Sequence, residues 1–449
     1  MSVVSAPTRR GPSGIGYLPG FVRRPETALL EYHRAFGDVV YFQRGPLRGY
    51  LIFHPREIAY VLEENAANYP HGQWLVRKTM ATMGRGIFAA DGELWRRYRR
   101  LIEPGLDGDR AARFSEHMTA NTAAMLDRWE ERRKRGEPVD VVWEMEELSR
   151  TNAGIGVFGE DYLGQQDVLG PARAIFIRQS GRELTSPLGA VPLTVPLPFH
   201  RTFLAARASY DQTVARLVEQ RRRTGATAGD DLLSALVHAR DPETGATLDD
   251  REVRDQATTI YFLWKPVAIT LAWVWYLLAR NPFAAERLGD EVARSLAARD
   301  PALGDLASLP YTRAVVAEAL RLHPPVLLLP REAAEDDELA GHPVPAGTRV
   351  AMSAHVTHRH PEFWDEPERF EPERFLRPDE RPAYAYFPFA EPGPRRCAGH
   401  DIAQTELAIV VAAIARRYRL ELLPGERVAT KMTVARDFTR GLRMRLAPA

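Results

Sequence analysis

Most of the chain repeats its apolar positions at the spacing of an amphipathic helix. The region 170–205 is interrupted by Pro187, Pro192, Pro196 and Pro198, so we expect two helices around a mobile lid there. The other predicted helices lie over 55–68, 91–101, 112–133, 141–158, 205–223, a stretch that opens at Asp230, and 311–322.

Alternation with the period of a strand is confined to short stretches of the chain. Residues 39–42 and 50–53 flank Arg44-Gly45-Pro46, which predicts a β-hairpin. Residues 421–446 predict further short strands. The stretch 69–88 is loop-like and dotted with aromatic residues, as in the wall of a binding pocket. The pattern therefore predicts a mainly helical protein with a small β part.

The most apolar stretch, 258–279, is long enough to cross a membrane. Lys265 near its middle would cost roughly 3 kcal/mol on insertion scales. Pro266 interrupts the helical hydrogen-bond ladder and predicts a kink. We therefore expect a buried core helix of a large soluble protein.

The composition is that of an ordinary soluble globular protein, with 45% hydrophobic and 27% charged residues and a net charge of +1. This balance argues against nucleic acid as a partner, because the local arginine runs are typical of solvated helix faces. A length of 449 residues suggests two or three domains, yet no linker divides the chain. Residues 1–20 lack an apolar core, so we expect neither a signal peptide nor a membrane anchor.

The single cysteine, Cys397, stands where a loop rich in proline and glycine runs into a helix-forming stretch, 402–407. One cysteine excludes an internal disulfide and any cysteine-only iron–sulfur or zinc site, which fits a reducing cytosol. Most lone cysteines are small buried hydrophobes. Here the helix N-terminus and the positive charge of Arg395 and Arg396 favour a thiolate.

The loop resembles the haem-binding loop of the cytochrome P450 family, F-x-x-G-x-R-x-C-x-G followed by A-x-x-E. The residues that fall on this pattern are Gly393, Arg395, Cys397, Gly399, Ala403 and Glu406. Phe389 departs from it, standing eight residues before the cysteine where the family has seven, as if Pro392 had been inserted. The resemblance implies haem b with its iron ligated by Cys397, and a mainly α fold with a small β-subdomain formed by one domain over 1–449.

Further motifs of the same family follow in order along the chain. Trp95 and Arg99 form a W-x-x-x-R pair which, with Arg331, would meet the carboxylates of the haem. The family's structural network would comprise Glu318, Arg321 and Arg374. Arg96 and Arg100 would face outward, where an acidic ferredoxin or similar electron donor docks. By the same resemblance, the substrate pocket would be lined by Phe88, Phe262, Leu263, Lys265, Val267, Val326, Leu327, Leu328 and Phe438.

The central helix departs from the family at its functional centre. Counted back from the close match at 275–282, the family's acid and threonine fall on Lys265 and Pro266, and its small-residue groove on Phe262 and Leu263. In the family that pair relays protons during oxygen activation, and neither residue here can do so. Lysine is scarce in the chain, so Lys265 is either a snorkelling surface residue or a lone cation that binds an anionic substrate.

The resemblance implies oxidation of a small lipophilic, natural-product-type substrate by a cytoplasmic monomer. The missing pair leaves two alternatives within haem chemistry: peroxide-driven oxidation of an anionic substrate, and a redox-neutral cyclisation or isomerisation. A non-catalytic haem carrier or sensor is the alternative outside enzymes. His355, His358 and His360 sit in a conventional family segment, so we do not expect them to bind a metal.

Overall fold

The computed structural model describes residues 24–449 apart from 45–46, 73–75, 77–79, 81, 107–108, 225–229, 298, 379 and 433–434. The chain divides into two compact units. The sheet unit comprises Met1–Val76, Glu318–Phe370 and Arg377–Cys397, and the helical unit comprises Arg77–Ala317, Glu371–Leu376 and Ala398–Ala449. Both units are built from distant parts of the sequence. The expectation that 1–449 forms one domain stays a prediction.

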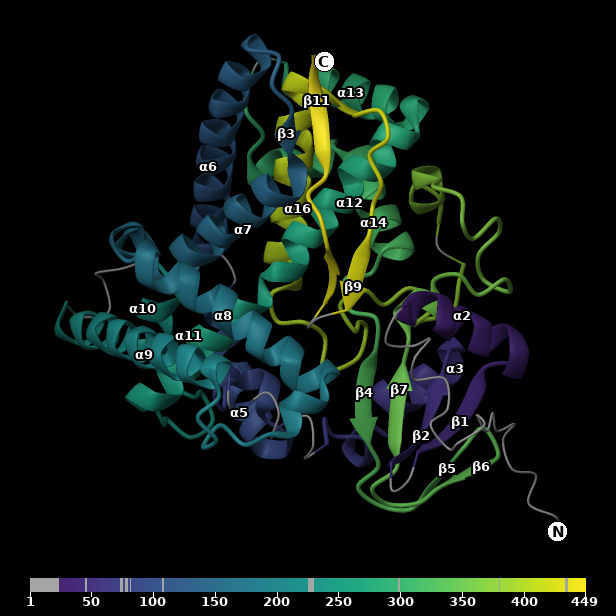
Figure 1. Ribbon diagram of the computed structural model, residues 1–449. Coiled ribbons are helices and arrows are strands. Elements are labelled where there is room, and N and C mark those ends of the chain that lie inside the picture. Colours follow the sequence, from purple (N-terminus) through teal and green to yellow (C-terminus); the bar gives the residue numbers. More distant parts are fainter. Residues whose placement is uncertain are drawn as a thin grey trace. The chain divides into compact units, whose positions relative to one another are not determined.

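A four-stranded sheet forms the centre of the sheet unit, with strand order β1-β2-β7-β4 (Figure 1). The bounds of its strands are Val39–Arg44 for β1, Leu47–Ile52 for β2, Arg349–Met352 for β7 and Leu329–Glu332 for β4. The pairing of β1 with β2 confirms the predicted hairpin, whose turn lies outside the described residues. Strand β2 runs parallel to β7, which joins two segments about three hundred residues apart.

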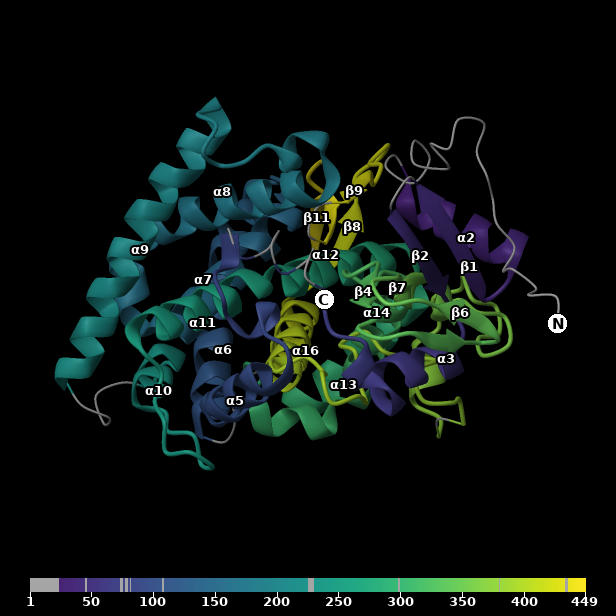
Figure 2. The ribbon, with the colours of Figure 1, turned by 90° about the horizontal axis from the view of Figure 1, so that it is seen from below.

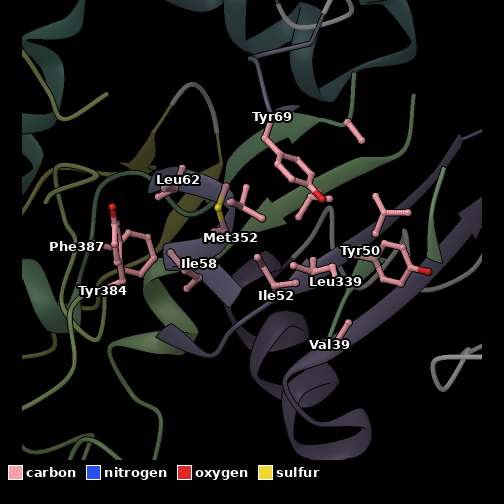
Figure 3. Close-up of a cluster of buried hydrophobic side chains, with 14 of the residues drawn as sticks. Val39, Tyr50, Ile52, Ile58, Leu62, Tyr69, Leu339, Met352, Tyr384 and Phe387 are labelled. Atoms are coloured by element: carbon pink, nitrogen blue, oxygen red, sulfur yellow. The ribbon is translucent and has the colours of Figure 1, made fainter. Parts of the chain in front are cut away.

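The apolar side chains of this sheet pack against the segment that follows β2 (Figure 3). The predicted helix over 55–68 forms as three short pieces, α3 (Pro55–Ala59), a π turn (Tyr60–Glu64) and a 3-10 turn (Ala66–Asn68). Ile58 and Leu62 meet Ile52 and Met352 in this core. The remaining regular elements of the sheet unit are α2 (Pro25–Phe36), β5 (Asp337–Leu339), β6 (His342–Val344) and α15 (Ala354–Thr357).

The helical unit carries most of the helices that the sequence predicts. They are α5 (Gly92–Ile102), α6 (Asp109–Lys134), α7 (Val141–Phe158), α8 (Gln166–Thr185), α9 (Pro198–Thr224), α10 (Leu232–His238), α11 (Asp250–Leu263), α12 (Lys265–Arg280), α13 (Pro282–Leu296), the first part of α14 (Pro310–Leu322) and α16 (His400–Arg417). Helices α6, α7, α12 and α16 pack side by side (Figures 1 and 2). Of the two helices expected within 170–205, the first forms as α8, which accommodates Pro171. The second is not separate, because it continues as α9 through the helix expected over 205–223.

Short strands complete the helical unit, as predicted for 421–446. A three-stranded sheet has the order β3 (Val139–Asp140), β11 (Arg443–Pro448), β8 (Tyr418–Leu422). A separate hairpin pairs β9 (Thr430–Met432) with β10 (Arg436–Phe438). This hairpin packs on α12 through Phe438, whose ring centroid lies 4.9 Å from that of Trp273. The mainly helical fold with small sheets is thereby confirmed.

The central apolar stretch forms two helices rather than one. Helix α11 ends at Leu263 and α12 begins at Lys265, with Trp264 between them, so the predicted interruption by Pro266 is found in the first turn of α12. Within the described residues, the span Asp250–Arg280 is the one candidate whose length and composition would suit a membrane crossing, and 76% of its most apolar window is buried in the protein.

Candidate active site

The cysteine loop is closed by backbone hydrogen bonds. The Cys397 N–H donates to the Phe389 carbonyl at 2.9 Å, and the Arg396 N–H donates to the Gly393 carbonyl at 3.0 Å. Ala390 adopts a left-handed conformation with φ of 60°. The additional residue of the loop is thus absorbed between Phe389 and Cys397, and Phe389 keeps direct backbone contact with the cysteine despite the longer spacing.

The surroundings of Cys397 fit a flat group bound at its sulfur. The side chain of Cys397 is exposed, and α16 begins shortly after it, at His400. A Cβ added at Gly399 would meet no atom within 4 Å, whereas one at Gly393 would lie 2.6 Å from the Tyr384 hydroxyl oxygen. Gly393 therefore lets the loop pack closely on its own unit, and Gly399 has open space where a Cβ would stand.

The residues expected to bind the haem carboxylates are found in both units. In the sheet unit Arg331 is buried on β4, and Arg395 Nη1 lies 3.2 Å from His71 Nδ1. In the helical unit Trp95 and Arg99 lie on α5, and the Arg99 guanidinium donates to Glu103 Oε1 at 2.5 Å. Their role toward haem stays a prediction.

Glu318 and Arg321 form a fully buried, two-pronged ion pair, with Nε–Oε2 at 2.6 Å and Nη2–Oε1 at 2.8 Å. Arg321 also donates to the backbone carbonyls of His358, Pro367 and Arg369. Every nitrogen of the guanidinium thus has an acceptor, and these hydrogen bonds offset the free-energy cost of burying the charge.

The structural pair predicted from E-x-x-R is therefore observed. The third expected member of the network, Arg374, belongs to the helical unit, where it bonds Glu371 at 3.3 Å. Its participation stays a prediction.

Lys265 lies between two carboxylates of the helical unit. Its Nζ is 2.9 Å from Glu146 Oε1 on α7 and 3.0 Å from Asp437 Oδ2 on β10. Burial raises the pKa of the Asp437 carboxyl, and the attraction of Lys265 opposes that shift. The geometry gives Lys265 two acidic partners, so it argues against both the lone cation over a haem and the snorkelling surface residue.

A buried carboxyl group lies beside the helix break. Glu406 on α16 accepts hydrogen bonds from the Trp264 indole N–H and, at 2.8 Å, from the Asn152 amide. Burial raises the pKa of Glu406 to about 7, against the effect of these two hydrogen bonds. The sequence marked Glu406 only as part of A-x-x-E, because nothing along the chain places a tryptophan of the central helix against it.

The predicted pocket residues are largely buried and apolar. Phe262, which the resemblance places in the family's small-residue groove, stacks on Phe176 of α8 with ring centroids 5.0 Å apart. Val267 and Phe438 in the helical unit and Leu327 in the sheet unit are also buried. Val326, Leu328 and Phe88 are half-buried, and the side chain of Leu263 lies outside the described residues. Their contact with substrate stays a prediction.

The basic residues of α5 are paired with acids. Arg100 lies 2.9 Å from Asp241 Oδ2 and 3.1 Å from Glu243 Oε2, and Arg96 lies 2.8 Å from Glu93 Oε2. Arg100 is therefore largely neutralised by its own unit. The proposed docking charge for an electron donor is smaller than the sequence suggests.

The three neighbouring histidines do not converge. The Phe387 N–H donates to His358 Nε2 at 3.0 Å, and His355 Nδ1 lies 3.1 Å from Arg359 Nη1. His360 instead faces Asp38, with its Nε2 2.9 Å from Oδ1. The expectation that these three side chains do not bind a metal together stays a prediction.

Comparison with known proteins places the chain in one family. The sequence model of the protein family "Cytochrome P450" matches residues 11–440. Cyclooctat-9-en-7-ol 5-monooxygenase of Streptomyces melanosporofaciens is 36% identical, with 92% of this chain and 88% of the relative covered. Cyclooctatin synthase of the same organism is 34% identical, covering 88% and 85%. Pentalenene oxygenase of Streptomyces avermitilis is 30% identical, covering 96% and 95%.

A family match across nearly the whole chain agrees with the exposed Cys397 at the end of a closed loop and with the mainly helical fold. The chain belongs to the cytochrome P450 family.

Proposed function

We propose that this enzyme oxygenates a neutral, lipophilic cyclic terpenoid. Membership of the family makes the chain a monooxygenase-type oxidoreductase that binds haem b. The substrate class is our proposal, and it is supported by relatives named for cyclooctat-9-en-7-ol, cyclooctatin and pentalenene.

Cys397 is the residue that would hold the iron of the haem, as its thiolate. The family match and the loop closed by the hydrogen bond from the Cys397 N–H to the Phe389 carbonyl support this assignment. Arg331, Arg395, Trp95 and Arg99 would bind the carboxylates. When bound, the haem supplies the redox chemistry, which the thiolate ligand biases toward oxygen activation.

The proposal of a neutral substrate rests on one observation, the ion cluster of Lys265, Glu146 and Asp437. An anionic substrate would need a cation with charge to spare, and Lys265 already faces Glu146 and Asp437. A further anion brought to this site would meet an excess of negative charge. The other predicted pocket residues are apolar, which suits burial of a hydrocarbon skeleton. Peroxide-driven oxidation of an anionic substrate loses its support for the same reason.

The handling of protons would also differ from that of the family. Pro266 has no hydroxyl, and Lys265 pairs with the carboxylates of Glu146 and Asp437. Of the groups at the helix break, Glu406 has a pKa near neutrality, raised to about 7 by burial. We propose that the Glu406 carboxyl takes up a proton near neutral pH.

A small electron donor such as a ferredoxin is the proposed partner, in a monomeric, cytoplasmic enzyme. Arg96 is the exposed cation of α5 and has a single acidic neighbour, Glu93. The donor would therefore contact α5 through few charges, and docking should depend only weakly on ionic strength.

The substrate proposal is tested by titrating the haem-loaded protein with two matched series of ligands. One series contains neutral cyclic terpenoid alcohols and hydrocarbons, and the other contains the corresponding carboxylic acids. Shift of the haem absorption band reports binding. We expect the neutral series to bind more tightly, and tighter binding of the acids would overturn the proposal.

The reaction type is tested with the tightest neutral ligand under three regimes: dioxygen with ferredoxin, reductase and NADPH; hydrogen peroxide alone; and strict anaerobiosis without an oxidant. We expect an oxygenated product, labelled from isotopic dioxygen, in the first regime. Product formed in the anaerobic regime would instead establish a redox-neutral isomerisation. Turnover in any regime would exclude a haem carrier.

A further inference from the structure

Two histidines and one aspartate of the sheet unit meet at a place remote in sequence from the cysteine loop. His33 lies in the last turn of α2, Asp38 lies just before β1, and His360 follows α15. His33 Nε2 is 3.0 Å and His360 Nε2 is 2.9 Å from the same oxygen, Asp38 Oδ1. We propose that these three side chains bind a borderline divalent cation of the zinc class.

The three ligand atoms are close enough for a tetrahedral site, with the two imidazole nitrogens free to approach each other as a metal ion enters. The three ligand atoms lie within 4.8 Å of one another. Bonds of about 2.0–2.1 Å to nitrogen and oxygen place the ligands of a tetrahedral zinc ion roughly 3.3 Å apart. The two nitrogen–oxygen distances therefore need to widen by only a few tenths of an ångström. Two imidazoles and a carboxylate favour zinc-like ions over magnesium, which prefers oxygen ligands.

The three side chains are held by the fold rather than by one another alone. The Phe53 N–H donates to the Asp38 carbonyl at 2.9 Å, which fixes the start of β1. The His33 ring packs edge-on against Phe53 with centroids 5.6 Å apart, and it lies 4.9 Å from the His360 ring. His360 is nearly fully buried. A site whose ligands are already placed loses less conformational entropy on binding a metal.

Charged groups of both signs surround the site, with Arg34, Arg56 and Arg359 close in sequence to His33, His54 and His360. Glu57 and Glu362 flank His54, whose ring lies 5.8 Å from that of His360. His54 Nδ1 accepts the Arg56 N–H and caps α3, so we do not count it as a ligand. The cation nearest His33 along α2 is Arg34, which is exposed. Water or solvent anion would occupy the fourth position of the metal.

One hydrogen bond opposes tight binding. The Glu362 N–H points at His360 Nδ1 over 3.3 Å, which assigns the ring proton of the metal-free protein to Nε2, facing Asp38. Metal binding at Nε2 moves that proton to Nδ1 and breaks this long hydrogen bond. The bound ion would thus replace a proton between His360 and Asp38, and we expect intermediate rather than very tight affinity.

The histidine–aspartate set was not accessible from the sequence. Asp38 and His360 are 322 positions apart, and the pattern grouped His360 with His355 and His358. Its function would be structural, since the metal would join the end of α2, the start of β1 and the segment after α15. The site lies wholly within the sheet unit.

The test measures zinc on the haem-loaded, chelator-treated protein by calorimetry and elemental analysis, so that haem iron does not interfere. We expect a single zinc ion per chain and a higher thermal midpoint when zinc is present. His33→Gln and Asp38→Asn should each weaken zinc binding about tenfold or more. His54→Gln is the matched control and should bind as the wild type does.

Three results would overturn the proposal: a wild type that takes up no zinc, ligand variants that bind zinc like the control, or magnesium binding with the same affinity as zinc. The thiolate-type spectrum of the reduced carbonyl adduct verifies that each variant is folded. If Asp38→Asn fails that criterion, His33→Gln decides alone, because that side chain lies at a helix end.

Discussion

By the resemblance, Lys265 stands where the family has an acid. The sequence alone therefore suggested a cation that binds an anionic substrate. The structure supplies both anions from within the chain, on α7 and on β10. Glu146 is 119 positions away along the chain, so no local pattern could have paired it with Lys265.

Removal of the Lys265 charge should cost stability rather than affinity for a neutral substrate. Lys265→Met leaves the largely buried Asp437 without its counter-charge, and we expect a loss of about 2 kcal/mol in the free energy of unfolding. Denaturant unfolding of the haem-loaded protein measures it. Asp437→Asn in the same chain should recover part of the loss, and affinity for neutral terpenoids should stay unchanged. Weaker binding of an anionic ligand alone would restore the lone-cation hypothesis.

Glu406 should make stability depend on pH. Its pKa is raised from the usual 4.5 to about 7, so the folded chain holds a proton that the unfolded chain releases. This contribution is fully present below pH 4.5 and is lost as the pH rises through 7, by up to about 3 kcal/mol. Unfolding of the wild type and of Glu406→Gln across this window measures it.

Glu406→Gln should remove that part of the slope, because its side chain does not titrate. Asp401→Asn on the exposed side of α16 is the matched control and should keep the slope. Parallel pH profiles for the wild type and Glu406→Gln would show that Glu406 titrates normally.

At the scale of elements, the sequence predicted the break between α11 and α12, but it did not predict which residues pack against that break. Pro266 predicts an interruption of the helix, and it lies in the first turn of α12. Backbone N–H groups in a first turn have no acceptor within the helix, so the N–H that proline lacks is not needed there. The same proline gave no indication that Trp264 would reach Glu406 on α16. Hydrophobic periodicity and proline positions report on neighbouring residues, whereas the partner of the buried Trp264 indole depends on how α16 packs against the helix break.

Pro266→Ala should therefore change little. The N–H that alanine restores lies in the first turn of α12 and needs no helical acceptor, and loss of the proline ring only loosens the unfolded chain, so we expect a change within about 1 kcal/mol. Ala268→Pro, two residues further into α12, is the matched contrast and should cost about 3 kcal/mol or more. Thermal unfolding followed by circular dichroism compares them. A large loss for Pro266→Ala would show that the break itself stabilises the fold.

For the whole molecule, the periodicity of the sequence predicted the helices and the hairpin, because amphipathic repeats and turn residues depend only on neighbouring positions in the chain. The π and 3-10 turns after α3 did not, since a helical pattern over 55–68 does not reveal where its ladder changes. The cysteine loop was found from its motif, and the structure added the left-handed conformation of Ala390 and the hydrogen bond from the Cys397 N–H to the Phe389 carbonyl. The cluster of His33, Asp38 and His360 depends on long-range pairing and left no sequence signal.

The central claim is that Cys397 ligates the iron of haem b through its thiolate. It is tested most directly by the absorption spectrum of the reduced carbonyl adduct, recorded for the wild type and for Cys397→Ala prepared with the same haem supply. We expect the thiolate-type band in the wild type and its absence in the variant. A wild-type adduct that absorbs away from the thiolate position, or a variant that keeps the band, would contradict the account.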